Sequence, residues 1–291
     1  MLHTLEHVFL HAIEDNISII PFLFVTYCIM EYMEHAVAAK TEGVVKYSGK
    51  MGPLFGGVLG VIPQCGFSAA AASFYSGGVV TLGTLLAIFL STSDEMLPIL
   101  ISETVPVTTI AKILGLKALI GVIAGFLVDF GLRKIGKAHV VQKHIHDLCE
   151  QEHCHCEEEE ASIWKSALVH TVKVFGFIFI VSALLNLVLE CGGESALEWL
   201  ANNNSFLAAI LTGIVGLVPN CAASVIITQL YLKQLISAGA MMAGLLVGAG
   251  VGILILFRTN RPVIQNVKIT GLLYAIGVAA GLLIDLIGIS F

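Results

Sequence analysis

The chain has 291 residues, of which 57% are hydrophobic and 12% are charged, and its formal net charge is −6. Soluble domains carry roughly 25% charged residues, so this composition, with a mean hydropathy of +0.91, predicts an integral membrane protein and excludes a soluble domain of any size. The acidic balance gives no support for a nucleic-acid partner.

Eight apolar runs follow one another along the chain, and the second four repeat the first four. GVLGVIPQCGFS at 57–68 returns as GIVGLVPNCAAS at 213–224, and GVIAGFLVD at 121–129 returns as GVAAGLLID at 277–285, each 156 positions later. This constant offset predicts a tandem duplication of one membrane unit. The expected parts are a first membrane repeat at 1–135, a cytoplasmic linker at 136–163 and a second membrane repeat at 164–291. The apolar runs lie at about 17–37, 52–77, 79–101, 112–132, 165–190, 205–231, 236–257 and 269–290.

The basic residues indicate how many times each unit crosses the membrane. If the segments around Pro63 and Pro219 span fully, Lys and Arg divide 8 inside to 7 outside. If each folds back as a re-entrant hairpin, the division becomes 12 to 3, with only Lys112, Lys117 and Lys233 outside. The positive-inside rule favours the second arrangement, and an odd number of crossings makes the two units inverted. We therefore predict an all-α polytopic membrane protein with two inverted repeats, each with three spanning helices and one re-entrant helical hairpin, about ten helical segments in all. Both termini are then extracytoplasmic.

The segment after each hairpin is predicted to be broken. Ser91-Thr92-Ser93-Asp94-Glu95 interrupts the first copy, and Gly248, Gly250 and Gly252 lie at the same depth in the second. Hydroxyl side chains and glycines both loosen a helix and release its backbone groups. A hairpin and a broken helix in each inverted half are typical of secondary transporters, whose helix ends and freed carbonyls meet near the membrane midplane.

The two hairpins carry one cysteine and one amide each. Cys65 and Cys221 would suit a soft metal or a trivalent metalloid as thiolates, although small cysteines also pack well between close helices. Gln64 and Asn220 either offer carbonyl oxygens to an ion or cap the broken turns. We treat all four as candidate substrate ligands.

Asp94 and Glu95 are the only acids deep in the third segment. An intramembrane carboxylate indicates an ion ligand or a proton carrier; the alternative is a structural pair with Lys112 or Lys117. The second repeat has Gly250 where Asp94 stands, so the predicted site is asymmetric.

The first spanning segment carries further candidate metal ligands. Glu31 and His35 are four residues apart and share a helix face, with Cys28 three residues before Glu31. This spacing suits a borderline divalent cation. Glu34 and His35 fall near the cytoplasmic end, where a solvated surface needs no ligand, so Glu31 is the stronger candidate of the three.

Asp129 and Asp285 end the fourth segment of each unit. Their recurrence at the repeat offset favours capping or packing over a role in transport for both.

The predicted linker is rich in metal-binding side chains. Residues 139–160, HVVQKHIHDLCEQEHCHCEEEE, hold five of the ten histidines and three of the seven cysteines. The run lacks the fixed spacing of a zinc finger and is typical of a flexible chelating tract, which predicts a cytoplasmic metal buffer or sensor; a merely polar linker is the alternative. The residues assigned to it are His144, His146, Cys149, His153, Cys154, His155 and Cys156.

The two hairpins with P-Q-C and P-N-C, the STSDEM break and the His/Cys linker together resemble a known family, the ten-transmembrane heavy-metal exporters. This family is grouped with bacterial arsenic efflux permeases and is sometimes described as manganese transporters. The resemblance covers essentially the whole chain, and ten helices result when each hairpin is counted as two arms. It implies efflux from a prokaryotic inner membrane.

The leading hypothesis is a secondary active transporter that exports a heavy-metal or metalloid ion, coupled to protons through Asp94, Glu95 or Glu31, without a cofactor and without enzyme activity. No Walker motif is present. The runner-up is a hydrolase like the polyprenyl-pyrophosphate phosphatases, but no Lys or Arg lies at 51–111 or 174–232 to hold phosphate. A passive cation channel is the third alternative, and a homodimer stays open as an assembly.

The sequence leaves the ion open. The cysteines favour arsenite, cadmium or copper(I), whereas the carboxylates and histidine favour manganese, zinc, cobalt or nickel.

Overall fold

A computed structural model describes the parts of the chain on which the following sections rest. These are residues 20–21, 24–25, 28, 51–61, 65–93, 96–134, 164, 168–169, 171–172, 175–176, 179–180, 205–219 and 221–291.

The described residues form helices and connecting turns, with no β-strand among them. In the first repeat, residues 51–59 are helical and are followed by α4 (Cys65–Ser76), α5 (Leu82–Ser91), α6 (Met96–Ser102) and α7 (Val107–Lys134). In the second repeat the helices are α11 (Ser205–Gly216), α12 (Cys221–Leu232), α13 (Ala238–Val247), α14 (Val251–Thr259) and α15 (Val263–Ile287).

Among the described residues, three stretches are long and apolar enough to cross a membrane: Val107–Lys134, Ala238–Thr259 and Val263–Ile287. The second of these is the pair α13 and α14, and 83% of its apolar window is buried inside the protein, against 33% for α7 and α15. The broken pair is therefore enclosed by other helices, whereas α7 and α15 present apolar side chains outward, as lipid-facing helices do.

The duplication predicted from the sequence is visible in the helix boundaries. Helices α4 and α12 begin and end 156 residues apart, as do α5 and α13, and α7 and α15 begin 156 residues apart. The contacts also recur, because α5 packs on α7 as α13 packs on α15. The same sequence pattern has thus produced the same local structure twice.

Two equivalent carboxylates fix the start of the equivalent helices α5 and α13. Asp129 accepts a hydrogen bond from the Thr81 hydroxyl at 2.7 Å and another from the Gly83 N–H at 2.8 Å. Asp285 accepts the same two bonds at the same lengths, from the Ser237 hydroxyl and from the N–H of the second residue of α13. Thr81 and Ser237 are themselves the N-caps, so the carboxylates satisfy N–H groups that a helix start leaves without partners. Capping or packing was predicted for Asp129 and Asp285, and the structure shows that both carboxylates cap a helix.

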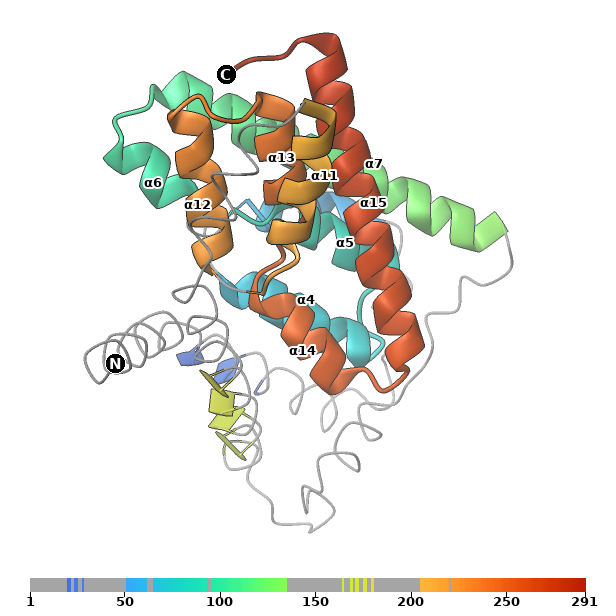
Figure 1. Ribbon diagram of the computed structural model, residues 1–291. Helices are drawn as coiled ribbons and strands as arrows, with labels where there is room; N and C mark the ends of the chain where they lie inside the picture. Colours follow the sequence, from blue (N-terminus) through green and yellow to red (C-terminus); the bar gives the residue numbers. More distant parts are fainter. Residues whose placement is uncertain are drawn as a thin grey trace, which may run out of the picture.

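The two repeats interlock. Helix α4 of the first repeat packs on α14 of the second, and α6 of the first packs on α12 of the second. Figure 1 shows α4 and α14 in the lower part of the labelled helices and α6 and α12 at their upper left. At the α4 end, the Ser76 and Thr259 hydroxyls lie 2.7 Å apart, and Gln265 Nε2 donates to the Tyr75 hydroxyl at 2.8 Å. Each repeat is therefore completed by a helix of the other.

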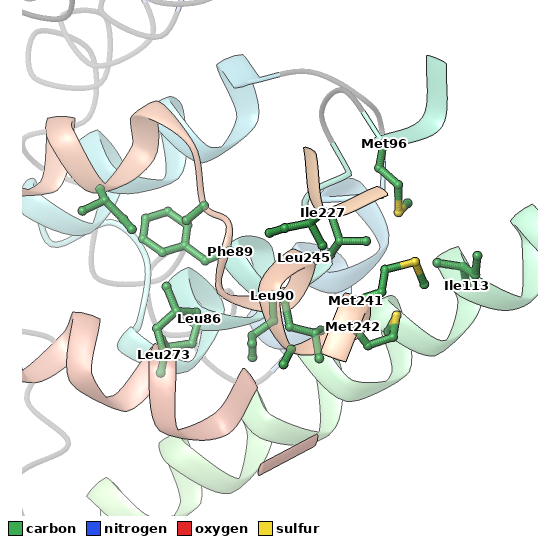
Figure 2. Close-up of a cluster of buried hydrophobic side chains, with 14 of the residues drawn as sticks. Leu86, Phe89, Leu90, Met96, Ile113, Ile227, Met241, Met242, Leu245 and Leu273 are labelled. Carbon is green, nitrogen blue, oxygen red and sulfur yellow. The ribbon is translucent and has the colours of Figure 1, made fainter. Parts of the chain in front are cut away.

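The core lies where the broken helices of both repeats cross. Figure 2 shows side chains from α5, α6, α7, α12, α13 and α15 in this cluster. Helix α5 contacts both α13 and α15 of the second repeat. One aromatic contact joins the early parts of the two repeats, since the ring centroids of Phe24 and Trp164 lie 5.9 Å apart. The members of the cluster labelled there are Leu86, Phe89, Leu90, Met96, Ile113, Ile227, Met241, Met242, Leu245 and Leu273.

Candidate functional site

The third segment of each repeat is interrupted at the equivalent residue, which confirms the predicted breaks. Helix α5 ends at Ser91 with Thr92 as its C-cap, and α6 begins at Met96. Helix α13 ends with Gly248 as its C-cap, and α14 begins just beyond Gly250. Gly250 has φ 52° and ψ −138°, a conformation that residues with a Cβ rarely adopt. The second break therefore depends on glycine, whereas the first is built from hydroxyl residues.

The hydroxyl side chains of the first break return to their own helix. The Ser91 hydroxyl donates to the Ala87 carbonyl at 2.8 Å, and the Thr92 hydroxyl donates to the Ile88 carbonyl at 2.7 Å. The Ser93 hydroxyl donates to the Ser91 carbonyl at 3.1 Å. These three hydroxyl residues are buried, with at most 2% of their surface exposed. These bonds from side-chain hydroxyls compete with the backbone hydrogen bonds of the helix. The helix ends here, and the Thr92 carbonyl is available to a neighbouring helix.

That neighbour is Lys117 of α7. Its ammonium group donates to the Thr92 carbonyl and, at 2.9 Å, to the Leu245 carbonyl in the last turn of α13. The side chain is 1% exposed, so a cation is held between the helix ends of the two repeats. Carbonyls in the last turn of a helix lack helical donors and form the negative end of its dipole, which makes them suitable partners for an ammonium group.

The structure distinguishes Lys117 from the two other lysines that the charge count assigns to the extracytoplasmic side. Lys112 and Lys233 are exposed, whereas Lys117 is buried. A buried Lys117 agrees with the alternative in which this lysine is a structural partner of Asp94 and Glu95, although both acids lie outside the described residues.

The helices after the two proline breaks approach the broken segment of the opposite repeat. Cys65 is the first residue of α4 and Cys221 is the first residue of α12. Ser68, one turn into α4, lies directly against Gly252 at the start of α14, where an added Cβ would be 2.8 Å from the Ser68 Cβ. The predicted hairpin of one repeat and the break of the other are thus brought together at close range.

The remaining predicted ligands lie outside the described residues. Cys28, on the first spanning segment, is described and is half-buried against the core. Within the described parts of the chain, no group of three or more His, Cys, Asp or Glu residues is arranged to hold a metal ion. The predicted residues that fall outside are Gln64, Asn220, Asp94, Glu95, Glu31, Glu34, His35 and the linker residues His144, His146, Cys149, His153, Cys154, His155 and Cys156.

Lys117 is the feature of this region that the sequence analysis did not assign to the site. One signal was available: its equivalent in the second repeat, 156 positions later, is Leu273. A lysine aligned with a leucine that is 0% exposed indicates a buried charge rather than a solvated helix end.

The chain was compared with known protein families. The model of a family described as "Putative, 10TM heavy-metal exporter" matches residues 4–193. No curated protein and no solved structure matches the chain. The matched residues include α4 to α7 and the whole of the predicted linker at 136–163. A match over this much of a 291-residue chain, together with its apolar spanning helices, places the protein among multi-pass membrane proteins, and the chain belongs to the 10TM heavy-metal exporter family.

Proposed function

We propose that the protein is a secondary active transporter that exports a heavy-metal or metalloid ion from the cytoplasm. The observation that carries this proposal is the interlocked centre: each break, at Thr92 and at Gly248, occurs at the equivalent position of its repeat, and the second break lies against the proline-break helix of the first repeat. Helix ends and freed carbonyls at such a crossing are the ordinary means by which transporters hold ions inside the membrane.

The proposed topology is two inverted repeats in which the segments around Pro63 and Pro219 are re-entrant hairpins. The proposal is supported by the short helices before and after Pro219, α11 and α12, each of 12 residues. At roughly 1.5 Å per residue each rises about 18 Å, too short to cross a hydrocarbon core of about 30 Å. The linker is then cytoplasmic, both termini are extracytoplasmic, and the membrane is the prokaryotic inner membrane.

The ion would be bound by groups from both hairpins and from the first break. Cys65 and Cys221 begin their helices, and the N-terminal end of a helix stabilises negative charge such as a thiolate. Asp94 and Glu95 stand in the chain between Ser93 and Met96, which are 1% and 0% exposed. An acidic pair flanked on both sides by buried residues is well placed to bind a cation or carry the coupling proton. In this proposal Gln64, Asn220 and Glu31 complete the ligand set, with Glu34 and His35 as secondary candidates.

The test is a resistance screen in an efflux-deficient bacterium against arsenite, cadmium, copper, manganese, zinc, cobalt and nickel. Cys65→Ser, Cys221→Ser and Asp94→Asn are compared with Cys191→Ser, a matched control on a cysteine outside the hairpins and outside every candidate ligand group. If the thiolates bind the substrate, the first two variants lose protection against one ion and the control keeps it. Protection by both cysteine variants together with failure of Asp94→Asn would leave a carboxylate site and remove the thiolates. No protection by the parent against any ion would refute export of these ions.

Coupling is tested in vesicles. Export that collapses when the proton gradient is dissipated supports proton coupling, whereas flux that only follows the ion's own gradient identifies a passive channel.

A further inference from the structure

The position of the buried Lys117 has an equivalent in the second repeat, and the two residues differ in charge. The repeats share their packing residues, and the equivalent of Lys117 is Leu273, which is fully buried on α15. Leu273 lies in the apolar cluster with Leu86 and Phe89 (Figure 2). A leucine therefore meets the packing requirement of this position in the second repeat. Burying an ammonium group costs several kcal/mol unless it is well bonded, so packing alone does not account for the lysine in the first repeat.

Two acceptors of Lys117 among the described residues come from separate halves of the protein. Thr92 is 25 residues away on the first repeat, and Leu245 is 128 residues away on the second. Both carbonyls belong to the C-terminal ends of the interrupted helices α5 and α13. Two helix C-termini directed at one point form a site of negative potential, and carbonyl oxygens of this kind coordinate small cations in membrane proteins.

We propose that this crossing is a carbonyl site for a monovalent cation and that the Lys117 ammonium group is its tethered occupant. The tethered cation joins the break of the first repeat to the end of α13 and holds the two repeats in the described conformation. The inference deepens the proposed function, on which it rests, because movement of one repeat against the other during transport must break at least one of the two bonds. Lys117 is thus a positioning residue at the hinge between the repeats, and it needs no contact with the exported ion.

The first test measures the bridge without measuring transport. Lys117→Met keeps an unbranched side chain of similar volume, one atom shorter, but removes the charge and the donors. Leu273→Met is its matched control at the equivalent position. Amide hydrogen exchange of the purified proteins is followed by mass spectrometry over residues 88–93 and 245–250. Since a hydrogen bond from a charged donor stabilises by enough to change an opening equilibrium about tenfold or more, exchange in both segments should accelerate by about that factor in Lys117→Met and stay unchanged in Leu273→Met. Unchanged exchange in Lys117→Met, or equal acceleration in the control, would overturn the proposal.

The second test refills the site. Lys117→Ala removes the three outer methylenes and the ammonium group, which together correspond to propylammonium. Added propylammonium should raise the unfolding temperature of Lys117→Ala, whereas propanol should not, and neither probe should stabilise the parent or Leu273→Ala. Equal stabilisation by propanol, or of Leu273→Ala, would show a simple cavity and refute a cation site.

The two tests separate the bridge from the function. Should Lys117→Ala fail to fold, the exchange comparison with Lys117→Met still decides. Should the parent protect cells from no metal while both tests succeed, the proposed export fails and the cation bridge stands. Should the parent protect and Lys117→Met protect equally well, the bridge takes no part in the transport cycle.

Discussion

Replacing the capping carboxylates gives a prediction whose size follows from the structure. Asp129→Ala removes two hydrogen bonds, from Thr81 and Gly83, that end on a charged acceptor. Such bonds contribute about 1.5 kcal/mol each at the lower end of their range, so the loss is about 3 kcal/mol. For a chain of this size about 1 kcal/mol corresponds to roughly 2–4 °C, and the unfolding temperature should fall by roughly 6–12 °C.

Because Asp285 makes the same two bonds at the same lengths, Asp285→Ala should cost the same within about 1 kcal/mol. The assay is thermal unfolding of purified protein in detergent, with Asp129→Asn as a graded variant, since an amide oxygen still accepts from the Gly83 N–H. Glu103→Ala, at an exposed position before α7, controls for the loss of a negative charge and should leave the unfolding temperature unchanged. A neutral Asp129→Ala beside a strongly destabilising Asp285→Ala would refute the claim that the repeats use these carboxylates alike.

Three further outcomes are expected. Gly216→Ala should no longer elute as a single species in size-exclusion chromatography, because the added Cβ would overlap a carbonyl oxygen of α13. Gly271→Ala, with open space around the added atom, should elute like the parent. A single, parent-like peak for Gly216→Ala would contradict the close packing of α11 on α13. Tyr75→Phe should lower the free energy of unfolding by about 1 kcal/mol, because the hydrogen bond from Gln265 Nε2 is lost. Adding Gln265→Met to this variant should cause no further loss. If the losses of the two single variants add fully in the double variant, the bond between the repeats contributes nothing to stability. Deletion of 144–160 should leave transport largely intact but change its dependence on metal concentration, measured by growth protection, and total loss of transport would refute the buffer role of the linker.

The repeated features of the fold were predictable from the sequence because each is signalled twice. The break after Ser91 and the break at Gly248 are indicated by different residues, hydroxyls and glycines, yet they fall at the same offset. Asp129 and Asp285 could be assigned as caps because a carboxylate that recurs in both units serves the architecture that both share. In a duplicated chain the two copies can be compared with each other, and features that both copies share predict the local structure.

The contacts between the repeats were not predictable in the same way. Helices α4 and α6 pack on α14 and α12 of the opposite unit, but their apolar sequences would fit a partner within their own unit equally well. Hydrophobic patterning states that a face is buried, not which helix buries it. A buried Lys117 was predictable only as a possible partner of Asp94 and Glu95. Its bond to the Leu245 carbonyl was not predictable, because Leu245 lies 128 residues away in the other repeat.

Where the repeats differ is the best guide to where a single ion can be held, because two equivalent halves would otherwise offer two equivalent sites. Ser93 is 1% exposed, and its equivalent in the second repeat, Ala249, is 0% exposed, so the hydroxyl is an addition to a position that alanine fills. Its bond to the Ser91 carbonyl, at 3.1 Å, is a neutral one, and Ser93→Ala should therefore cost only about 1 kcal/mol. If the polar break serves the ion, the same substitution should lower metal export well beyond what this loss of stability explains, as measured by flux per folded protein in vesicles. Ala249→Val, a change in volume at the equivalent position, is the control for packing at the crossing, and it should lower the unfolding temperature before it lowers export per folded protein. Parental export by Ser93→Ala would mean that the hydroxyls at the first break only interrupt the helix, as glycine does at the second.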